Sequence, residues 1–436
     1  MTEKPLTLRE ISWFFFPLML NVQFMSVSHS FINAALARQQ DPITSLAAFS
    51  VAMVLHMFVA APSYQNQAIT IAMVRGRKSL YATWAFVLLT AVYVAVLLAL
   101  LAWTPVGDFV LYRFLGVEEQ VAVEVQAVLA ILVPLPFLTG ARGLLQGLTI
   151  QARRTGLVSI ATGIRIGALL AFLALGAPWL SGARLAALAL LGCIAVETLF
   201  AAWFARRCRV DYQGVREHSL GEIFRFSLPL ALASSLQYTI PLLINAIISR
   251  LPDGALALAA FGVIRGFLFL LAGPLRNLQQ AYQTLVRNAA DYPALLRFHR
   301  RVSGSLAALL ILTAYPLNGP ILGTVMGLDA EMRAYIALPL ACCALYPIFH
   351  GAANLLRGLF TQNHQTGFLG RATLYKLCYL LFCWGALLLV PLPVPGVAVA
   401  IFLIVSAEFF ELVYMHRHRN RQPRAAALFA ETPPRG

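Results

Sequence analysis

Apolar runs of about 20 residues recur along the whole chain, and the run 80–104 has no charged side chain. A run of this length matches the hydrocarbon thickness of a lipid bilayer. Inside a bilayer every backbone polar group must find its partner within the protein, which leaves helices and closed barrels as spanning structures. Because the runs are continuous and do not alternate with polar residues, they indicate helices. We therefore expect an all-α, polytopic membrane protein.

Composition and charge agree with this class. Hydrophobic residues make up 60% of the chain and charged residues 12%, with a mean hydropathy of +0.75. A soluble domain has about 25% charged residues. The net charge of +15 would suit nucleic acid, but the basic residues cluster at the ends of apolar runs, which is a topology signal. We expect no nucleic-acid partner, and we expect the first run to be a retained helix because it has no small-residue cleavage site.

Twelve candidate spans can be counted, and the loops between them alternate in charge. The spans are 9–37, 46–74, 80–104, 122–150, 157–179, 183–205, 223–250, 255–287, 302–321, 333–360, 367–391 and 395–416. The basic loops are those around Arg75, Arg153, Arg206 and Arg300, together with the tail from Arg417. By the positive-inside rule both termini lie in the cytoplasm, and the protein belongs to the inner (plasma) membrane. The longer connections LYRFLGVEEQV and LGTVMGLDAEM are expected to be short amphipathic pieces on the outer surface.

The chain contains an internal duplication. INAALAR, from Ile32, returns as INAIISR, from Ile244, and the two copies align without a gap from Leu8 to Arg75 at an offset of 212 residues. A second block, PFLTGARGLLQG and PIFHGAANLLRG, aligns at an offset of 211. Six spans per half is an even number, so both halves enter the membrane in the same direction, as in the parallel repeats of some transporters. We expect a half at 1–205, a linker at 206–222, a second half at 223–416 and a disordered cytoplasmic tail at 417–436.

The first span of each half is unusually polar. Gln23, Ser26 and Asn33 share one helix face, and Tyr238 and Asn245 occupy the matching face of the seventh span. Hydrogen-bonding contact between packed helices is one interpretation. A whole stripe in both halves favours the other interpretation, a face toward a wet cavity.

The eighth span carries two arginines within an apolar run. Arg265 and Arg276 are eleven residues apart, which is three turns of a continuous α-helix. An arginine at bilayer depth costs about 3 kcal/mol or more, so it needs a partner or water. Their repeat mates are Met53 and Tyr64, so only the second half carries these charges. Gln280 and Gln283 lie further along the same span.

Other ionisable residues leave two interpretations open. Arg142, Arg357 and Lys376 lie toward span ends, where they either snorkel to the interface or face a partner. Glu197 and Glu408 are repeat mates inside spans. Each carboxylate is a candidate for coupling to a proton or cation, or else a structural partner of Arg165 or Lys376 in the adjacent span.

Histidines and prolines inside the spans complete the list of candidates. His29 and His56 are further candidates for ion coupling, because histidine titrates near neutral pH. Three repeat-matched proline pairs are helix breakers, and each predicts a bend that is either a static kink or a gating hinge. These pairs are Pro17 with Pro229, Pro62 with Pro274, and Pro136 with Pro347.

Known catalytic motifs are missing from the sequence. There is no Walker motif, no GxGxxG after a strand and no HExxH, so we expect no enzyme activity and no cofactor. The two six-helix halves, the early FFFPL from Phe14 to Leu18, and the RGLLQG...ARRTG block resemble the multidrug/oligosaccharidyl-lipid/polysaccharide (MOP) exporter superfamily, whose members have the MATE-like fold. Within it, PLALASSLQYTIPLLINAIISR, Gly273–Pro274 and the acidic position at Glu408 are similar to the progressive ankylosis branch.

This resemblance implies a V-shaped bundle with a central cavity lined by spans one, two, seven and eight. Drug exporters of the superfamily often couple to ions through an acidic residue on the first or seventh span. Here Glu10 and Glu222 lie at the cytoplasmic start of those spans, which argues against drug or cation antiport.

We therefore expect a monomeric secondary transporter that exports an anionic small molecule by alternating access. Arg265 and Arg276 would neutralise the substrate, and Gln23, Ser26, Asn33, Tyr238, Asn245, Gln280 and Gln283 would supply neutral contacts. The alternatives are a flippase for a lipid-linked pyrophosphate precursor and a cation or drug antiporter. Besides substrate, the expected partners are membrane lipids and a proton or sodium ion.

Overall fold

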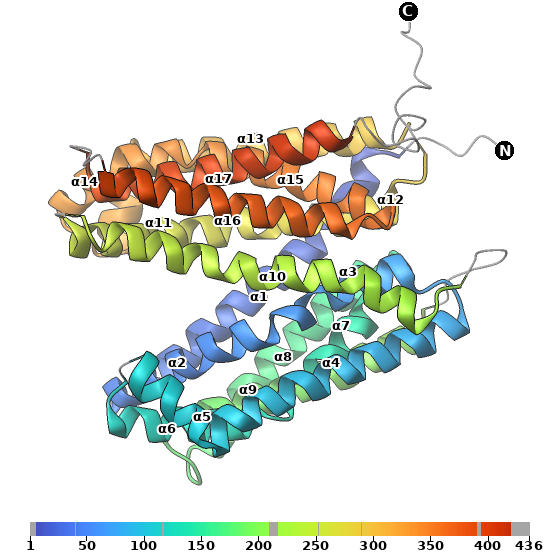
Figure 1. The fold of residues 1–436 in the computed structure, drawn as a ribbon, viewed down its shortest axis with the longest axis horizontal. Coiled ribbons are helices and arrows are strands. Elements are labelled where there is room, and N and C mark those ends of the chain that lie inside the picture. Colours follow the sequence, from blue (N-terminus) through green and yellow to red (C-terminus); the bar gives the residue numbers. More distant parts are fainter. Residues whose placement is uncertain are drawn as a thin grey trace, which may run out of the picture. The chain divides into compact units, whose positions relative to one another are not determined.

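The computed structural model describes residues 6–39, 41–115, 117–208, 217–251, 253–288, 290–389 and 394–419, and every regular element in these ranges is helical. The first six predicted spans correspond to α1 (Leu8–Leu36), α2–η1–α3 (Pro42–Ala60, Ala61–Gln65, Asn66–Met73), α4 (Arg77–Trp103), α6–α7 (Glu119–Leu132, Leu135–Gln151), α8 (Thr155–Gly176) and α9 (Gly182–Arg206). The last six correspond to α10 (Leu220–Ile248), α11–η3–α12 (Gly254–Ala272, Gly273–Asn277, Leu278–Leu285), α13 (Tyr292–Ala314), α14–α15 (Ala330–Cys342, Leu345–Gln362), α16 (Thr366–Leu389) and α17 (Gly396–Arg419). Figure 1 shows the long helices.

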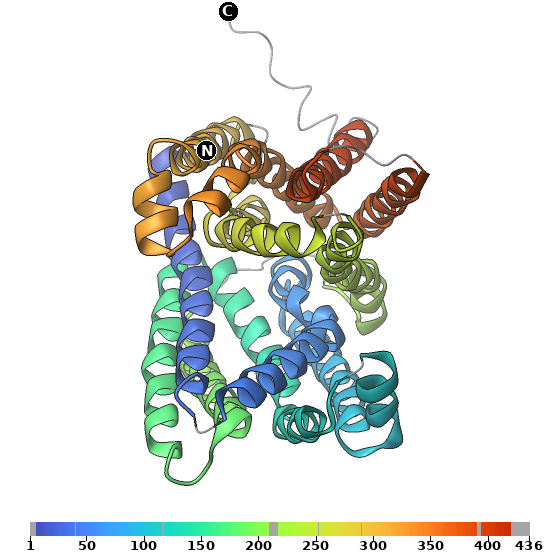
Figure 2. The ribbon, with the colours of Figure 1, turned by 90° about the vertical axis from the view of Figure 1, so that its left-hand side faces the viewer.

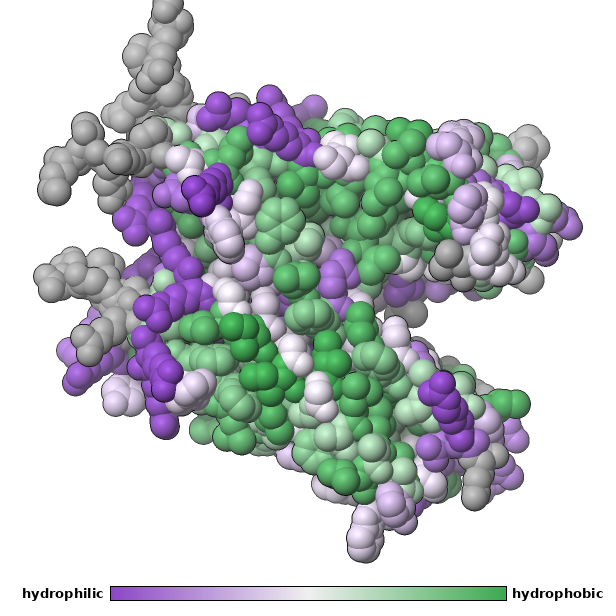
Figure 3. All heavy atoms as spheres, turned by 180° about the vertical axis from the view of Figure 1, so that it is seen from behind, coloured by the Kyte–Doolittle hydropathy of each residue, from purple (hydrophilic) through white to green (hydrophobic). Residues whose placement is uncertain are grey.

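Among the described residues, nine helices are long and apolar enough to cross a membrane, or up to eleven if each bent pair counts as one span. The bent pairs are α6 with α7, at 47°, and α13 with η4 (Asn318–Val325), at 75°. Helices thus occupy all twelve predicted ranges, but twelve spans are not confirmed. On the face that Figure 3 shows, hydrophobic side chains predominate along the middle of the long helices and hydrophilic ones gather mainly toward the ends. The protein is an integral membrane protein.

One predicted boundary is clearly wrong. The ninth span was expected at 302–321, whereas α13 covers Tyr292–Ala314, so Arg297, Arg300 and Arg301 lie on this helix and not in a loop. Pro293 in the first turn starts the helix early, because its fixed backbone angle suits that position. At the C-terminus α17 runs to Arg419, so the first residues of the expected tail are helical. The rest of the tail, 420–436, and the middle of the predicted linker, 209–216, lie outside the described residues.

The helix breaks follow the internal duplication. Pro62 and Pro274 lie in the 3-10 turns η1 and η3, which are equivalent at the offset of 212 residues. Pro136 and Pro347 lie in the first turns of α7 and α15, directly after the breaks that separate them from α6 and α14. The two longer connections, which the sequence predicts on the outer surface, contain the π-helical segments η2 (Phe109–Phe114) and η4. Pro17 and Pro229 do not end a helix, because α1 and α10 are helical throughout, and a kink at either proline stays a prediction.

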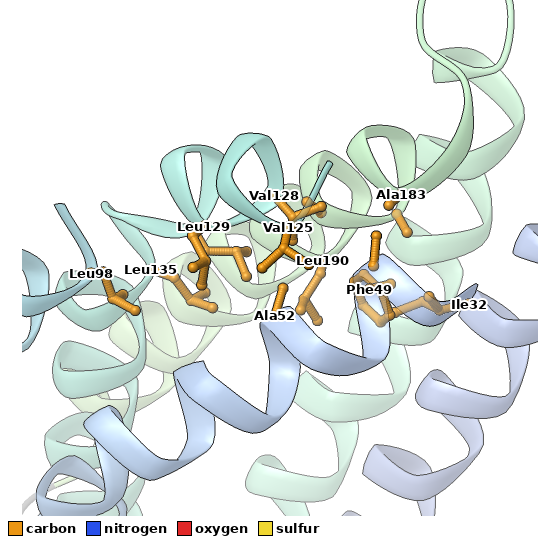
Figure 4. Close-up of a cluster of buried hydrophobic side chains, with 14 of the residues drawn as sticks. Ile32, Phe49, Ala52, Leu98, Val125, Val128, Leu129, Leu135, Ala183 and Leu190 are labelled. Carbon is orange, nitrogen blue, oxygen red and sulfur yellow. The ribbon is translucent and has the colours of Figure 1, made fainter. Parts of the chain in front are cut away.

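The chain packs as two compact units. The N-unit is Phe16–Ser235, and the C-unit is Leu236–Gly436 together with Met1–Phe15. In the N-unit, Ile32, Phe49, Val125, Leu129 and Leu190 belong to a buried apolar cluster (Figure 4). The C-unit has a cluster of its own, which includes Ile244, Phe261 and Ala400. Figure 2 shows α16 and α17 of the C-unit side by side, in red.

Packing and duplication divide the chain at different residues. The start of α1 belongs to the C-unit, where the rings of Phe15 and Phe298 meet at 5.2 Å and the amide of Leu6 donates to Asp291 at 3.2 Å. Likewise the start of α10 belongs to the N-unit, where Phe224 meets Phe86. The unit boundaries thus fall inside the first helix of each repeat.

A half-buried hydrogen-bond centre joins three elements of the C-unit. Asp253, just before α11, accepts hydrogen bonds from the hydroxyl of Tyr335 and from the amide of Gly396, which lies 2.9 Å from its Oδ2. Partial burial opposes the charged form, but these two donors outweigh it and lower the pKa of Asp253. The carboxylate therefore links the starts of α11 and α17 to α14.

Candidate functional site

The polar stripe on α1 is partly open to the surroundings. Gln23 and Ser26 are half-buried, and Asn33 is exposed. The hydroxyl of Ser26 donates to the carbonyl of Val22, 3.2 Å away on the same helix, so it does not join α1 to a neighbour. On α10, Tyr238 and Asn245 are half-buried.

The two predicted substrate arginines are exposed in the C-unit. Arg265 lies on α11 and Arg276 on η3, and among the described residues neither has an ion-pair partner. The 3-10 turn η3 interrupts the helix, so the eleven residues between the two arginines are not three turns of a continuous α-helix. Arg276 does interact electrostatically with Tyr238. Gln280 is half-buried and Gln283 buried on α12, and both have polar interactions.

A buried charge cluster lies in the N-unit, where α9 packs against α7 and α8. We call Arg142, Arg165 and Glu197 the N-cluster. Nη1 of Arg142 is 2.7 Å and Nη1 of Arg165 is 3.5 Å from the same carboxylate oxygen, Oε2 of Glu197. The other oxygen, Oε1, is 2.7 Å from the hydroxyl of Thr162 and accepts from the amide of Gln146 at 3.1 Å. Arg165 and Glu197 are 1% and 0% exposed, so this is an interior ion pair.

The C-unit has a cluster at the equivalent place. We call His350, Arg357, Lys376, Glu408 and Glu411 the C-cluster, which joins α15, α16 and α17. Lys376 pairs with Glu408 and lies 2.9 Å from Glu411, while Arg357 pairs with Glu411. Nδ1 of His350 lies 3.2 Å from Glu408. Two carboxylates therefore face two basic side chains, Arg357 and Lys376, here.

These clusters show the partners of the ionisable residues. Glu197 pairs with Arg165 and Glu408 with Lys376, as one of the two interpretations expected, and a role of either carboxylate in ion coupling stays a prediction. Snorkelling is wrong for Arg142, Arg357 and Lys376, because an interior carboxylate lies within ion-pair distance of each. Each charge is held by a partner on a neighbouring helix.

Sequence reasoning missed several members of the clusters. Glu411 follows Glu408 at a spacing of three, so the pattern EFFE placed both on one face of α17. Gln146 is the repeat mate of Arg357, and the duplication could have indicated it. Asn21, whose Oδ1 lies 2.6 Å from the hydroxyl of Thr162, left no comparable signal.

The two candidate coupling histidines have different surroundings. His29 on α1 is half-buried and close enough to Arg165 to interact electrostatically. His56 on α2 is 2% exposed, and its Nδ1 has no hydrogen-bond partner among the described residues. The structure therefore places His29 beside the N-cluster.

Comparison with solved structures identifies the fold. A MATE protein in the bent conformation aligns with a TM-score of 0.75 and 15% identity over 96% of this chain and 95% of its own. A MOP superfamily transporter from Pyrococcus furiosus aligns with a TM-score of 0.74 and 14% identity over 99% and 100%. The eukaryotic MATE transporter AtDTX14 aligns with a TM-score of 0.71 and 15% identity over 97% and 98%.

Neither a comparison with protein-family models nor one with curated protein sequences found a match. The chain has a MATE-like fold, as expected from its sequence. The similarity to the progressive ankylosis branch remains a prediction.

Proposed function

We propose that this chain, which has the fold of the MATE-type transporters, is a secondary active transporter. Its substrate is an anionic small molecule that bears a phosphate, nucleotide or carboxylate group, which it moves out of the cytoplasm by alternating access. The observation that carries this proposal is the pair Arg265 and Arg276, two exposed cations within an apolar helical segment. A cation facing lipid at that depth costs about 3 kcal/mol or more, so these side chains need water or an anion.

Only the second copy of the duplicated segment carries these two charges. In the N-unit the equivalent residues, Met53 and Tyr64, pack against the apolar cluster. In the C-unit the same two positions are exposed and basic. A guanidinium group presents a planar fork of donors that matches phosphate and carboxylate oxygens. Gln23, Ser26, Asn33, Tyr238, Asn245, Gln280 and Gln283 are the proposed neutral contacts.

Cation or drug antiport has weaker support, because the acidic residues of α1 and α10 already cap their helices. Glu10 accepts from the amide of Thr7 at 2.9 Å, and Glu222 accepts from the amide of Ser219 at 2.9 Å. These are equivalent capping boxes in the two repeats. The remaining residues of α1 and α10 include no other carboxylate.

A solved structure of similar fold supports the proposal of an anionic substrate. The report on the Pyrococcus furiosus transporter states that reverse polarity of its binding pocket suggests a different function. The MATE-like fold therefore has a precedent for a pocket whose polarity departs from the usual one, and exposed arginines fit such a departure.

The test is transport by the full chain in proteoliposomes. A panel of phosphates, nucleotides and carboxylates is offered to wild type, Arg265→Ala, Arg276→Ala and the control Arg184→Ala, whose arginine pairs with Glu124 at a helix end. We expect the rate of transport of an anionic substrate to fall at least tenfold in Arg265→Ala and in Arg276→Ala. The control should transport it at the wild-type rate. Unchanged transport in both variants would contradict the proposal.

The coupling ion is tested in the same vesicles with a pH gradient or a sodium gradient. Glu197, Glu408, His29 and His56 are the candidate coupling residues. Glu197 and Glu408 already bind cationic side chains, which disfavours a sodium site at either carboxylate. We propose a proton as the coupled ion, so His29→Gln or His56→Gln should weaken the response to a pH gradient. A sodium response without a pH response would contradict this choice.

A lipid-linked pyrophosphate flippase is the second candidate, favoured by an apolar groove in the N-unit. The groove, of about 550 Å³, is lined by residues that include Phe137, Phe172, Leu191 and Ala195. A polyprenyl tail could lie there while the basic residues hold the pyrophosphate. Ala195→Trp should then block the flipping of a fluorescent polyprenyl-pyrophosphate lipid and leave transport of soluble anions intact.

A further inference from the structure

The two charge clusters are equivalent in the duplication but unequal in charge. Glu408 and Glu411 lie three residues apart on α17, and their repeat mates on α9 are Glu197 and Phe200. The C-cluster thus has two carboxylates for Arg357 and Lys376. The N-cluster has a single carboxylate for two guanidinium groups and carries one excess positive charge.

The hydrogen bonds of the N-cluster show where this excess lies. Both guanidinium groups face the same oxygen of Glu197, and its other oxygen is occupied by Thr162 and Gln146. Nε and Nη1 of Arg165 and Nε of Arg142 are buried and have no hydrogen-bond partner among the described residues. Donor groups of both arginines therefore remain available after Glu197 is fully used.

Nearby groups do not supply the missing negative charge. Cys193 on α9 interacts with Arg165, but a thiol is a weak acceptor. His29 on α1 approaches Arg165, and Tyr64 on η1 approaches Arg142. Among the described residues, Glu197 is the only carboxylate paired with either arginine.

An uncompensated charge in the interior is costly, and arginine cannot lose its proton to avoid that cost. Water could satisfy the free donors but would not neutralise the charge. In the C-cluster the same need is met by the carboxylate of Glu411, which pairs with Arg357 and Lys376. The chain therefore contains its own example of the group that the N-cluster lacks.

We propose that the N-cluster binds a small monovalent anion, either chloride or a single carboxylate group, at the free donors of Arg165 and Arg142. The anion takes the role that Glu411 has in the C-cluster. One negative charge balances the excess, and the buried setting restricts its size. The site lies within the N-unit, whereas the proposed substrate arginines Arg265 and Arg276 lie in the C-unit, so this inference goes beyond the proposed function.

The test measures thermal unfolding of the purified full chain in detergent. Sodium chloride, sodium formate and sodium gluconate are titrated at constant ionic strength and pH. We expect the Tm to rise with chloride or formate until it saturates, since a ligand of the folded state stabilises it by mass action. Gluconate, which is too bulky for the interior, should have no such effect. A response to chloride alone assigns the site to halide, and a response to formate alone assigns it to carboxylate.

Two variants make the test specific. Phe200→Glu installs the carboxylate that the C-cluster has, so it should remove the anion dependence, whereas Phe200→Leu should keep it. If Phe200→Glu does not fold, Arg165→Gln removes the excess charge and should abolish the dependence too. Arg184→Gln, at an exposed ion pair, serves as the matched control and should respond like wild type.

Equal Tm in all three salts for wild type, or an unchanged anion dependence in Phe200→Glu or Arg165→Gln, would overturn the proposal. These outcomes do not depend on transport. Failure of the anion site is therefore separate from failure of the transport function proposed above.

Discussion

A single carboxylate, that of Glu197, holds the N-cluster together. Glu197 has no exposed surface, yet it contacts two arginines, a threonine and a glutamine from α7 and α8. A charge in such a place is stable only with partners, and its partners depend on it in return. The residue therefore matters for stability whether or not it also has a role in transport.

Glu197→Gln is expected to destabilise the protein strongly. The substitution keeps the size of the side chain but leaves two guanidinium groups without a counter-ion, which costs about 3–5 kcal/mol for a buried pair. Reversible unfolding in mixed detergent micelles measures the change in free energy of unfolding.

The control is Glu124→Gln, which breaks the Arg184–Glu124 pair of 2.8 Å, whose side chains are 46% and 30% exposed. Exposed pairs contribute about 0–1 kcal/mol, so this change should be small. If Glu197→Gln and Glu124→Gln lowered the free energy of unfolding equally, burial of the N-cluster would add nothing to the stability of its ion pairs.

The sequence indicated the charged residues but not their arrangement. A charge inside an apolar run stands out against its neighbours, so Arg165, Glu197, Lys376 and Glu408 were all identified. Their distances depend on how α7, α8 and α9, or α15, α16 and α17, rotate against one another, and this follows from packing across helices. The shared oxygen of Glu197 could therefore be found only in the structure.

Among the helices, the same close crossing occurs twice. Gly147 on α7 faces Thr70 and Gln67 of α3, and its repeat mate Gly358 on α15 faces Tyr282 and Gln279 of α12. A Cβ at Gly147 would lie 3.1 Å from the carbonyl oxygen of Gln67, and one at Gly358 would lie 2.9 Å from that of Gln279. Small residues at such crossings let two helices approach closely.

Gly147→Ala and Gly358→Ala should each lower stability by about 1–3 kcal/mol, because backbone atoms cannot move aside as a flexible side chain would. The control is Gly304→Ala on α13, where an added Cβ meets nothing within 4 Å. There the higher helix propensity of alanine should give a gain of up to about 1 kcal/mol. Unfolding in mixed micelles distinguishes the three, and a loss in the control as large as in the crossing variants would refute the packing argument.

The sequence predicted where the helices lie, but it predicted only some of the positions at which they are interrupted. Apolar runs indicated all twelve ranges, and four of the six prolines mark the breaks. Pro17 and Pro229 have the same chemistry yet lie in unbroken helices. A proline leaves a carbonyl without its usual partner, and surrounding groups determine whether the helix continues.

At the scale of the whole molecule, the orientation in the membrane remains a prediction from charge. The loops around Arg75 and Arg153 are basic, whereas those at Asp41 and Asp108 are not. The positive-inside rule then places both termini in the cytoplasm. Green fluorescent protein fused after Gly436 should fluoresce, and alkaline phosphatase should be active when fused after Gln39 and inactive when fused after Arg77. The reverse pattern of phosphatase activity would show the opposite orientation.

The sequence by itself determined the class of protein, its helical ranges and its duplication. The length of an apolar run and the offset of a repeat depend only on the order of residues along the chain. It also identified the residues whose charge is costly in an apolar segment. Only the tertiary structure decided which of these are paired in the interior, as Glu197 and Glu408 are, and which are exposed with no ion-pair partner in the described part of the chain, as Arg265 and Arg276 are. Pairing depends on distances between helices that are far apart in the chain, and those distances are set by packing.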